Sequence, residues 1–187
     1  MLKFITLFFL FLHWIYWIEK AKETNLKKPK SNNMSFWQLL EKLLIRFTGT
    51  VVTFQLVGLN IFNFSAGRIV SYFGFTLFLI GLLISVIARK EIDTNWTGGY
   101  EYQIKKYHSL VTTGIYRYIR HPIYLGLLCI ALGVELVVQS YLFLFVFLFF
   151  FWFYYWGKRE EKLLSEHFGK EYELYVKRTK MFIPYIF

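Results

Sequence analysis

Cysteine and metal-binding patterns are scarce in this chain of 187 residues. Its one cysteine, Cys129, lies inside an apolar run, so no disulfide can form within the chain and no cysteine-based zinc motif exists. The four histidines are scattered, and no two of them stand three or four residues apart, the spacing that a metal site on a helix would prefer. We therefore expect no metal ion.

Several common functional motifs are also missing. The sequence holds no G-x-G-x-x-G after a strand, no P-loop and no H-E-x-x-H, which argues against the usual nucleotide-binding and zinc-protease sites. No pattern of small residues typical of a cleavage site follows the apolar N-terminal run. We expect a retained membrane anchor there rather than a signal peptide.

What the chain does contain is long apolar runs. Hydrophobic residues make up 56% of it and aromatic residues 22%, and they are clustered rather than periodic, which is typical of an integral membrane protein. The charged residues that give the net charge of +10 lie mainly between these apolar runs. We interpret it as the basic margin of a protein in a lipid bilayer, and we expect no nucleic-acid partner.

Five runs approach the length of about 20 residues that crosses a bilayer, and helices are the default for such spans. The second run is the weakest, because Gln55, Asn60 and Asn63 interrupt it. The fourth and fifth are separated only by Gln139 and Ser140, which predicts a tight antiparallel hairpin. The five predicted spans are residues 2–18, 47–64, 69–88, 122–138 and 141–156.

The positive charges predict how the spans are oriented. With five crossings, all Lys and Arg residues except Lys3 and Arg68 fall on one side, in segments 19–46, 89–120 and 157–187. The positive-inside rule makes that side cytoplasmic, with the N-terminus outside and the C-terminus inside. We therefore expect an all-α integral membrane protein with about five transmembrane helices and a C-terminal cytoplasmic helix.

The chain divides by its patterns into two regions. Residues 1–68 hold two N-terminal spans and a basic loop that carry no specific functional signal. Residues 69–187 hold three spans, a polar loop at 89–121 and a C-terminal helix over 158–180 that should break or bend near Gly169.

Two polar clusters flank the predicted hairpin at its open end. Arg120 and His121 precede the fourth span, whose Pro122 suits the first turn of a helix. Glu160 and Glu161 follow the fifth span, and Glu160 shares a helix face with Leu164, so we expect it to point inward. The two clusters should meet at the water boundary and form a ligand site, where a carboxylate can accept hydrogen bonds from ribose hydroxyls.

Glu135 lies late in the fourth span. Carboxylates inside membranes are functional candidates by default. The outer interface is near, however, and we expect simple solvent contact for Glu135.

The ordered motifs of residues 70–187 resemble those of the membrane-embedded methyltransferases, which include isoprenylcysteine carboxyl methyltransferases and phospholipid methyltransferases. The matching pieces are His108-Ser-Leu-Val111, Gly114-x-Tyr116, Arg120-His121-Pro122-x-Tyr124-x-Gly126, Glu160-Glu161-x-x-Leu164, Phe168-Gly169, Tyr172-x-x-Tyr175 and Ile183-Pro184. The resemblance implies a methyltransferase that uses S-adenosylmethionine on a lipophilic, membrane-soluble acceptor. It implies cofactor contacts at Gln103, His108, Ser109, Leu110, Val111, Tyr116, His121, Pro122, Ile123, Tyr124 and Glu160.

Methyl transfer asks for positioning rather than for a catalytic base if the acceptor is a carboxylate, which is already ionised at neutral pH. We assign no catalytic residue for that reason. The carboxyl methyltransferases carry an arginine four residues before the ligand glutamate, where this chain has Trp156, with Arg159 close by in sequence. Trp156 and Arg159 are therefore the candidate substrate residues, and a prenylcysteine carboxylate is one possible acceptor.

Two other interpretations stay open. Membrane sterol reductases that use NADPH also carry a His-Pro-x-Tyr segment, although Ile123 and Leu127 differ from the residues typical of them. A non-catalytic scaffold of the same fold is the second alternative. Binding of the cofactor would separate all three.

Overall fold

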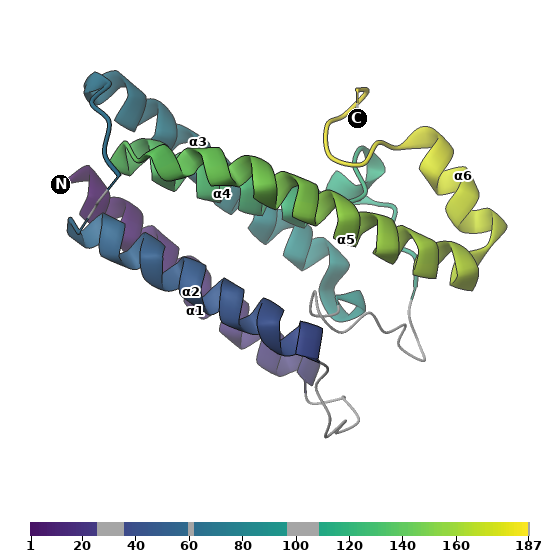
Figure 1. Ribbon diagram of the computed structural model, residues 1–187. Helices are drawn as coiled ribbons and strands as arrows, with labels where there is room; N and C mark the ends of the chain where they lie inside the picture. The colour runs from purple at the N-terminus through teal and green to yellow at the C-terminus, as the bar shows by residue number, and fades with distance from the viewer. Residues whose placement is uncertain (26–35, 60–61, 97–108, 187) are drawn as a thin grey trace. The chain divides into compact units, whose positions relative to one another are not determined.

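The computed structural model describes residues 1–25, 36–59, 62–96 and 109–186, and all their regular elements are helices apart from two isolated β-bridges (Figure 1). The longer helices are α1 (Leu2–Asn25), α2 (Phe36–Val57), α3 (Gly67–Ile92), α4 (Pro122–Val138), α5 (Phe145–Phe168) and α6 (Lys170–Arg178). Three short 3-10 helices accompany them: η1 (Asp93–Asn95), η2 (Gly114–Arg117) and η3 (Tyr141–Leu144). The predicted all-α class is confirmed.

Within the described part of the chain, three helical segments are long and apolar enough to cross a membrane: Leu2–Glu23, Gly67–Asn95 and Tyr141–Phe168. The shorter helix α4 is also apolar along its 17 residues. These segments support an integral membrane protein. Five crossings, and the orientation that the charges predict, stay predictions.

The predicted second span has the wrong bounds. The helix begins at Phe36 and ends at Val57, so Gly58, Leu59 and residues 62–64 lie outside it. Gly58 adopts a φ of 112°, a left-handed conformation that ends the helix and favours glycine. The chain then runs past the α4–α5 turn, where Phe64 N donates to Gln139 O and Tyr141 N donates to Phe62 O.

Residues Met1–Thr76 and Gly133–Phe143 form one compact unit. In it α1 and α2 lie side by side (Figure 1). Its interior holds a polar contact, because Gln55 Nε2 donates to Glu135 Oε2 and to Ser140 Oγ, each at 3.0 Å. The expected solvent contact of Glu135 is therefore wrong: its side chain is buried and joins α2 to the end of α4.

Residues Leu77–Leu132 and Leu144–Phe187 form the second unit. Here α3 and α4 approach backbone to backbone, because a Cβ added at Gly81 would lie 2.7 Å from the carbonyl oxygen of Gly126. Small residues permit such close helix contacts in membranes. The boundaries between the units fall inside α3 and α4, and the sequence division into 1–68 and 69–187 stays a prediction.

The C-terminal region is helical on both sides of Gly169, but its first part does not begin a new helix. Residues 158–168 continue α5 without a break, and α6 folds back from the end of α5 (Figure 1). The predicted break at Gly169 is confirmed, since this residue has a φ of 53° and separates the two helices. This break returns the chain toward the start of α4.

Candidate functional site

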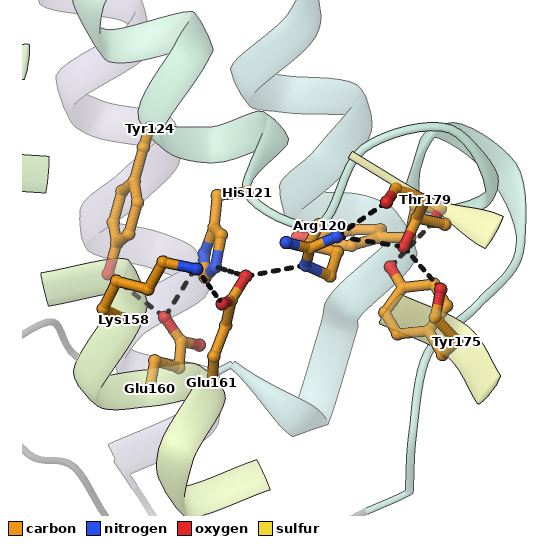
Figure 2. Close-up of polar contacts among 9 residues, drawn as sticks. Arg120, His121, Tyr124, Lys158, Glu160, Glu161, Tyr175 and Thr179 are labelled. Carbon is orange, nitrogen blue, oxygen red and sulfur yellow. Dashed lines mark hydrogen bonds and ion pairs between the residues drawn. The ribbon is translucent and has the colours of Figure 1, made fainter. Parts of the chain in front are cut away.

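The two polar clusters of the hairpin meet, as the sequence predicts (Figure 2). Arg120 and His121 precede α4, while Glu160 and Glu161 lie two turns before the end of α5. His121 Nδ1 lies 3.6 Å from Glu160 Oε2, and His121 Nε2 lies 3.5 Å from Glu161 Oε1. The buried imidazole therefore faces one carboxylate with each of its ring nitrogens.

The two carboxylates have different surroundings. Glu161 Oε1 accepts from Arg120 Nε at 2.6 Å, and its Oε2 lies 3.0 Å from Lys158 Nζ. Glu160 accepts from the Tyr124 hydroxyl at 3.2 Å, and 35% of its side chain is exposed. Glu161 is thus held by the buried guanidinium of Arg120 and by the more exposed Lys158, whereas the carboxylate of Glu160 is partly exposed.

Aromatic rings line one side of the cluster. The ring of Tyr124 is parallel to that of His121, with centroids 5.3 Å apart, and to that of Phe153 at 4.9 Å. The interplanar angle is 3° in both pairs. This stack fixes the direction of the Tyr124 hydroxyl toward Glu160, because ring rotation would break both stacking contacts.

The segment Thr179–Phe182, here called the C-terminal strap, pairs with the residues before α4. Arg120 N donates to Lys180 O at 2.8 Å, and His121 N donates to Met181 O at 3.1 Å. Arg120 also donates through its side chain to Thr179 O at 2.7 Å. The strap therefore fixes the backbone of both residues that open α4.

Packing under the strap is tight. The ring of Phe182 contacts those of His121 and Phe150, with centroids 6.0 and 5.6 Å apart. Gly157 leaves room for Met181 and His121, since a Cβ there would collide with the Met181 methyl group and lie 3.2 Å from His121 Nε2. Of the apolar C-terminal segment, Phe182 is buried, whereas Tyr185 and Ile186 are exposed.

Tyr116 belongs to the same region. Its side chain is buried, and its carbonyl oxygen accepts from the Tyr175 hydroxyl at 2.7 Å. Burial, together with the nearby negative charge of Glu160, raises the pKa of Tyr116, so its hydroxyl stays protonated at neutral pH. The preceding Thr113 donates to Glu91 at the end of α3, which fixes the start of η2.

The structure brings His121, Tyr124 and Glu160 into contact and buries Pro122 and Ile123 beside them. Ser109 lies apart from this contact, bound through its backbone N to Asn95 Oδ1 at 2.9 Å, and Leu110 and Val111 follow it, half-buried. Gln103 and His108 lie outside the described residues. The roles of all these residues as cofactor contacts stay predictions.

The candidate substrate residues lie on α5 before Glu160. The guanidinium carbon of Arg159 lies 5.0 Å from the centre of the Trp156 ring and 6.0 Å from that of Tyr155. The Trp156 ring also packs against Trp152. An exposed cation therefore lies over Trp156, and the role of both residues in binding a substrate stays a prediction.

Sequence reasoning placed Arg120 and Glu161 in the two polar clusters but gave them no role in holding the site together. Tyr175 belongs to a motif of the resemblance, although its bond to the carbonyl group of Tyr116 was not predicted. Thr179 was missed, because nothing distinguishes it from an ordinary amphipathic helix end.

Comparison with known proteins identifies the family of the chain. A family model described as Phospholipid methyltransferase matches residues 69–171, more than half of the chain. A probable protein-S-isoprenylcysteine O-methyltransferase of Oryza sativa subsp. indica is 32% identical over 120 residues, covering 63% of this chain and 62% of that protein. The protein-S-isoprenylcysteine O-methyltransferase of Saccharomyces cerevisiae is 32% identical over 139 residues, covering 73% and 58%.

The fold has a solved counterpart. The structure of a eukaryotic intramembrane Ras methyltransferase, an isoprenylcysteine carboxyl methyltransferase, superposes with a TM-score of 0.59 over 83% of this chain and 55% of that chain, at 20% identity. The two proteins share a fold. The chain spans about 60% of the length of the curated relatives it matches. On the family match, this chain is a member of the phospholipid methyltransferase family.

Proposed function

We propose that this protein is an S-adenosylmethionine-dependent methyltransferase that acts on a lipophilic acceptor within the membrane. The observation that carries the proposal is the partly exposed Glu160 carboxylate, which Tyr124 and His121 orient where the open ends of α4 and α5 meet. Membership of the phospholipid methyltransferase family supports the reaction class.

The residues present fit such a cofactor. Glu160 accepts only one hydrogen bond from the described residues, so the carboxylate retains acceptor capacity for ribose hydroxyls. Tyr124 and Phe153 offer aromatic surface, which favours cations as well as flat heterocycles. His121, Tyr124 and Glu160 would hold the cofactor, together with the segment Ser109–Val111 and with Gln103 and His108.

When bound, S-adenosylmethionine would supply a methyl group that is attached to a positively charged sulfur and can be transferred to a nucleophile. The chain itself contributes orientation, since the C-terminal strap and the Arg120–Glu161 contact fix His121 from two directions. No side chain needs to remove a proton if the acceptor is a carboxylate, because that group is ionised at neutral pH. We therefore assign no catalytic base.

The acceptor class that we favour is the carboxylate of an S-prenylated cysteine. Two of the relatives are named for methyl transfer to isoprenylcysteine. Arg159 over the Trp156 ring supplies an exposed cation on α5, and such a cation can attract a carboxylate. A prenyl chain suits the exposed aromatic side chains of α5, such as Phe151 and Tyr155.

The site should face the cytoplasm. The positive-inside rule puts the loops on either side of the α4–α5 hairpin's open end on the cytoplasmic side, and the N-terminus outside. Accessibility of single cysteines introduced near each end, measured with a membrane-impermeant thiol reagent in oriented vesicles, tests this orientation.

The first experiment is a calorimetric titration of the detergent-purified protein with S-adenosylhomocysteine, with NADPH as the comparison ligand. We expect micromolar binding of S-adenosylhomocysteine alone. Binding of NADPH alone would move the protein to the membrane reductases, and binding of neither by a folded sample would favour a non-catalytic scaffold.

The second experiment identifies the acceptor. The protein in vesicles is supplied with methyl-labelled S-adenosylmethionine and either N-acetyl-S-farnesylcysteine or the matching cysteamine, which lacks the carboxylate. We expect base-labile label, a methyl ester, from the first compound alone. Label on both compounds, or label that resists base, would exclude a carboxylate as the acceptor.

A further inference from the structure

A second concave surface lies between the polar end of α5 and α6. This groove has a volume of about 480 Å³ and is open to solvent. Its lining includes Lys158, Glu161 and Lys162 from α5, and Tyr172, Glu173 and Lys177 from α6. It is separate from the face that Glu160 presents to Tyr124, so the proposed methyl transfer does not use it.

The groove carries an excess of positive charge. Three ammonium groups face two carboxylates, and one of these, Glu161, is already bound by the buried guanidinium of Arg120. Lys162 approaches only Glu166, at 4.0 Å on the exposed surface, where ion pairs are weak. Lys177 has no carboxylate within ion-pair distance among the described residues. The two lysines are therefore available for an anion.

Tyr172 supplies the second, independent observation. Its side chain is 2% exposed and lines the groove, yet its hydroxyl has no hydrogen-bond partner among the described residues. Burial and the charge of Glu161 raise the pKa of this phenol, so it keeps its proton at neutral pH. Buried donors are nearly always paired in folded proteins. A bound acceptor at the base of the groove would satisfy this one.

The position of the groove along α5 indicates which kind of anion it binds. The apolar run of α5 extends through Trp156, and Lys158 is the first charged residue after it. The groove therefore begins where the hydrocarbon region ends, at the depth of lipid headgroups. Basic pockets beside transmembrane helices at this depth suit the phosphates of anionic lipids.

We propose that the groove between α5 and α6 binds the phosphate group of an anionic phospholipid, through Lys162, Lys177 and the Tyr172 hydroxyl. The ammonium groups attract the phosphate oxygens as point charges, and the phenol donates a hydrogen bond from below. Ser165, which also lines the groove, adds a second hydroxyl donor. The proposal goes beyond methyl transfer and does not require it.

The test uses the full chain in a neutral detergent, without S-adenosylmethionine. Short-chain phosphatidic acid, phosphatidylcholine and inorganic phosphate are titrated separately at low ionic strength, and bound ligand is counted by native mass spectrometry and calorimetry. We expect saturable one-to-one binding of phosphatidic acid. Phosphatidylcholine should bind much more weakly, because its quaternary ammonium group is repelled by the lysines.

Variants locate the site. Lys162→Ala and Lys177→Ala should each weaken binding of phosphatidic acid roughly fivefold, the effect of one lysine near a lipid surface. Lys170→Ala is the matched control, because Lys170 is an exposed lysine of α6 that does not line the groove. An equal loss in all three variants would mean attraction by net charge alone and would overturn the proposal.

Tyr172→Phe separates binding from folding. Since the hydroxyl has no partner among the described residues, its removal should leave the thermal midpoint of the ligand-free protein unchanged or higher. The variant should still bind phosphatidic acid severalfold more weakly than the unaltered protein does. Unchanged affinity would overturn the proposal, and inorganic phosphate binding as tightly as phosphatidic acid would assign the groove to a free anion instead of a lipid.

Discussion

Arg120 Nε lies 2.6 Å from Glu161 Oε1, and the two side chains are only 8% and 11% exposed. The contact joins the residue before His121 to the residue after Glu160, so it fixes the spacing of the two candidate ligand residues (Figure 2). The same guanidinium binds Thr179 O in the C-terminal strap. One side chain therefore ties α4, α5 and the strap together.

Replacing one partner of this ion pair should destabilise the protein more than replacing both partners. Glu161→Gln or Arg120→Met should each cost about 3 kcal/mol, because the remaining charge is buried with an inadequate partner. The double variant Arg120→Met with Glu161→Met should recover part of the loss. Thermal midpoints in detergent check this, and a double variant with the full sum of both losses would contradict it.

Glu160→Gln should affect the ligand rather than the fold. The amide can still accept from Tyr124 but lacks the charge, so binding of S-adenosylhomocysteine should weaken by about tenfold, with an unchanged thermal midpoint. Calorimetric titration measures the affinity. Glu166→Gln, an exposed carboxylate on the same helix, is the control and should bind normally.

Phe182→Ala tests whether the C-terminal strap stabilises the protein, and it should lower the thermal midpoint. Phe182 is 1% exposed against His121 and Phe150, and truncation of a buried phenylalanine leaves a cavity that costs about 3–5 kcal/mol. The matched control is Ile186→Ala, where the side chain is 76% exposed. Equal thermal midpoints for the two variants would show that the strap does not pack in solution.

Gly126→Ala should disturb the contact of α3 with α4. A Cβ there would lie 2.9 Å from both Gly81 O and Ser85 N, and neither backbone can yield as a flexible side chain does. We expect a loss of about 1–3 kcal/mol, measured as a lower thermal midpoint. Gly49→Ala in α2, where no atom lies within 4 Å of the added Cβ, should leave the midpoint unchanged or raise it, because alanine favours a helix more than glycine does.

Arg159→Gln tests acceptor recognition. Removing the cation over Trp156 should raise the KM for a carboxylate acceptor about fivefold, because a partly exposed ion pair contributes about 1 kcal/mol. The affinity for S-adenosylhomocysteine should not change. A fall in kcat with an unaltered KM would indicate that Arg159 does not bind the acceptor.

The meeting of His121 with Glu160 could be predicted because it follows from local rules. Two helices joined by Gln139 and Ser140 must run antiparallel, so polar residues that end one span and begin the other come to the same level. The packing of Tyr124 near Glu160 follows from the same register.

Other features depend on contacts between distant segments. The contact of Arg120 with Thr179 depends on the turn at Gly169, which brings the C-terminal strap back to the start of α4. No local sequence pattern relates Thr179 to a residue before α4. Glu135 is similar, because its partner Gln55 lies on a different helix. The end of α2 was missed because the sequence stays apolar beyond Gly58, although the helix itself ends at Val57.

The C-terminal strap also bears on the order of biosynthesis. Both helices of the hairpin leave the ribosome before the strap does, yet Arg120 N and His121 N receive their acceptors from Lys180 and Met181. Membrane insertion of the hairpin alone would thus leave the beginning of α4 without these partners. The candidate site is therefore completed only by a later folding step, after the last residues of the chain have been synthesised.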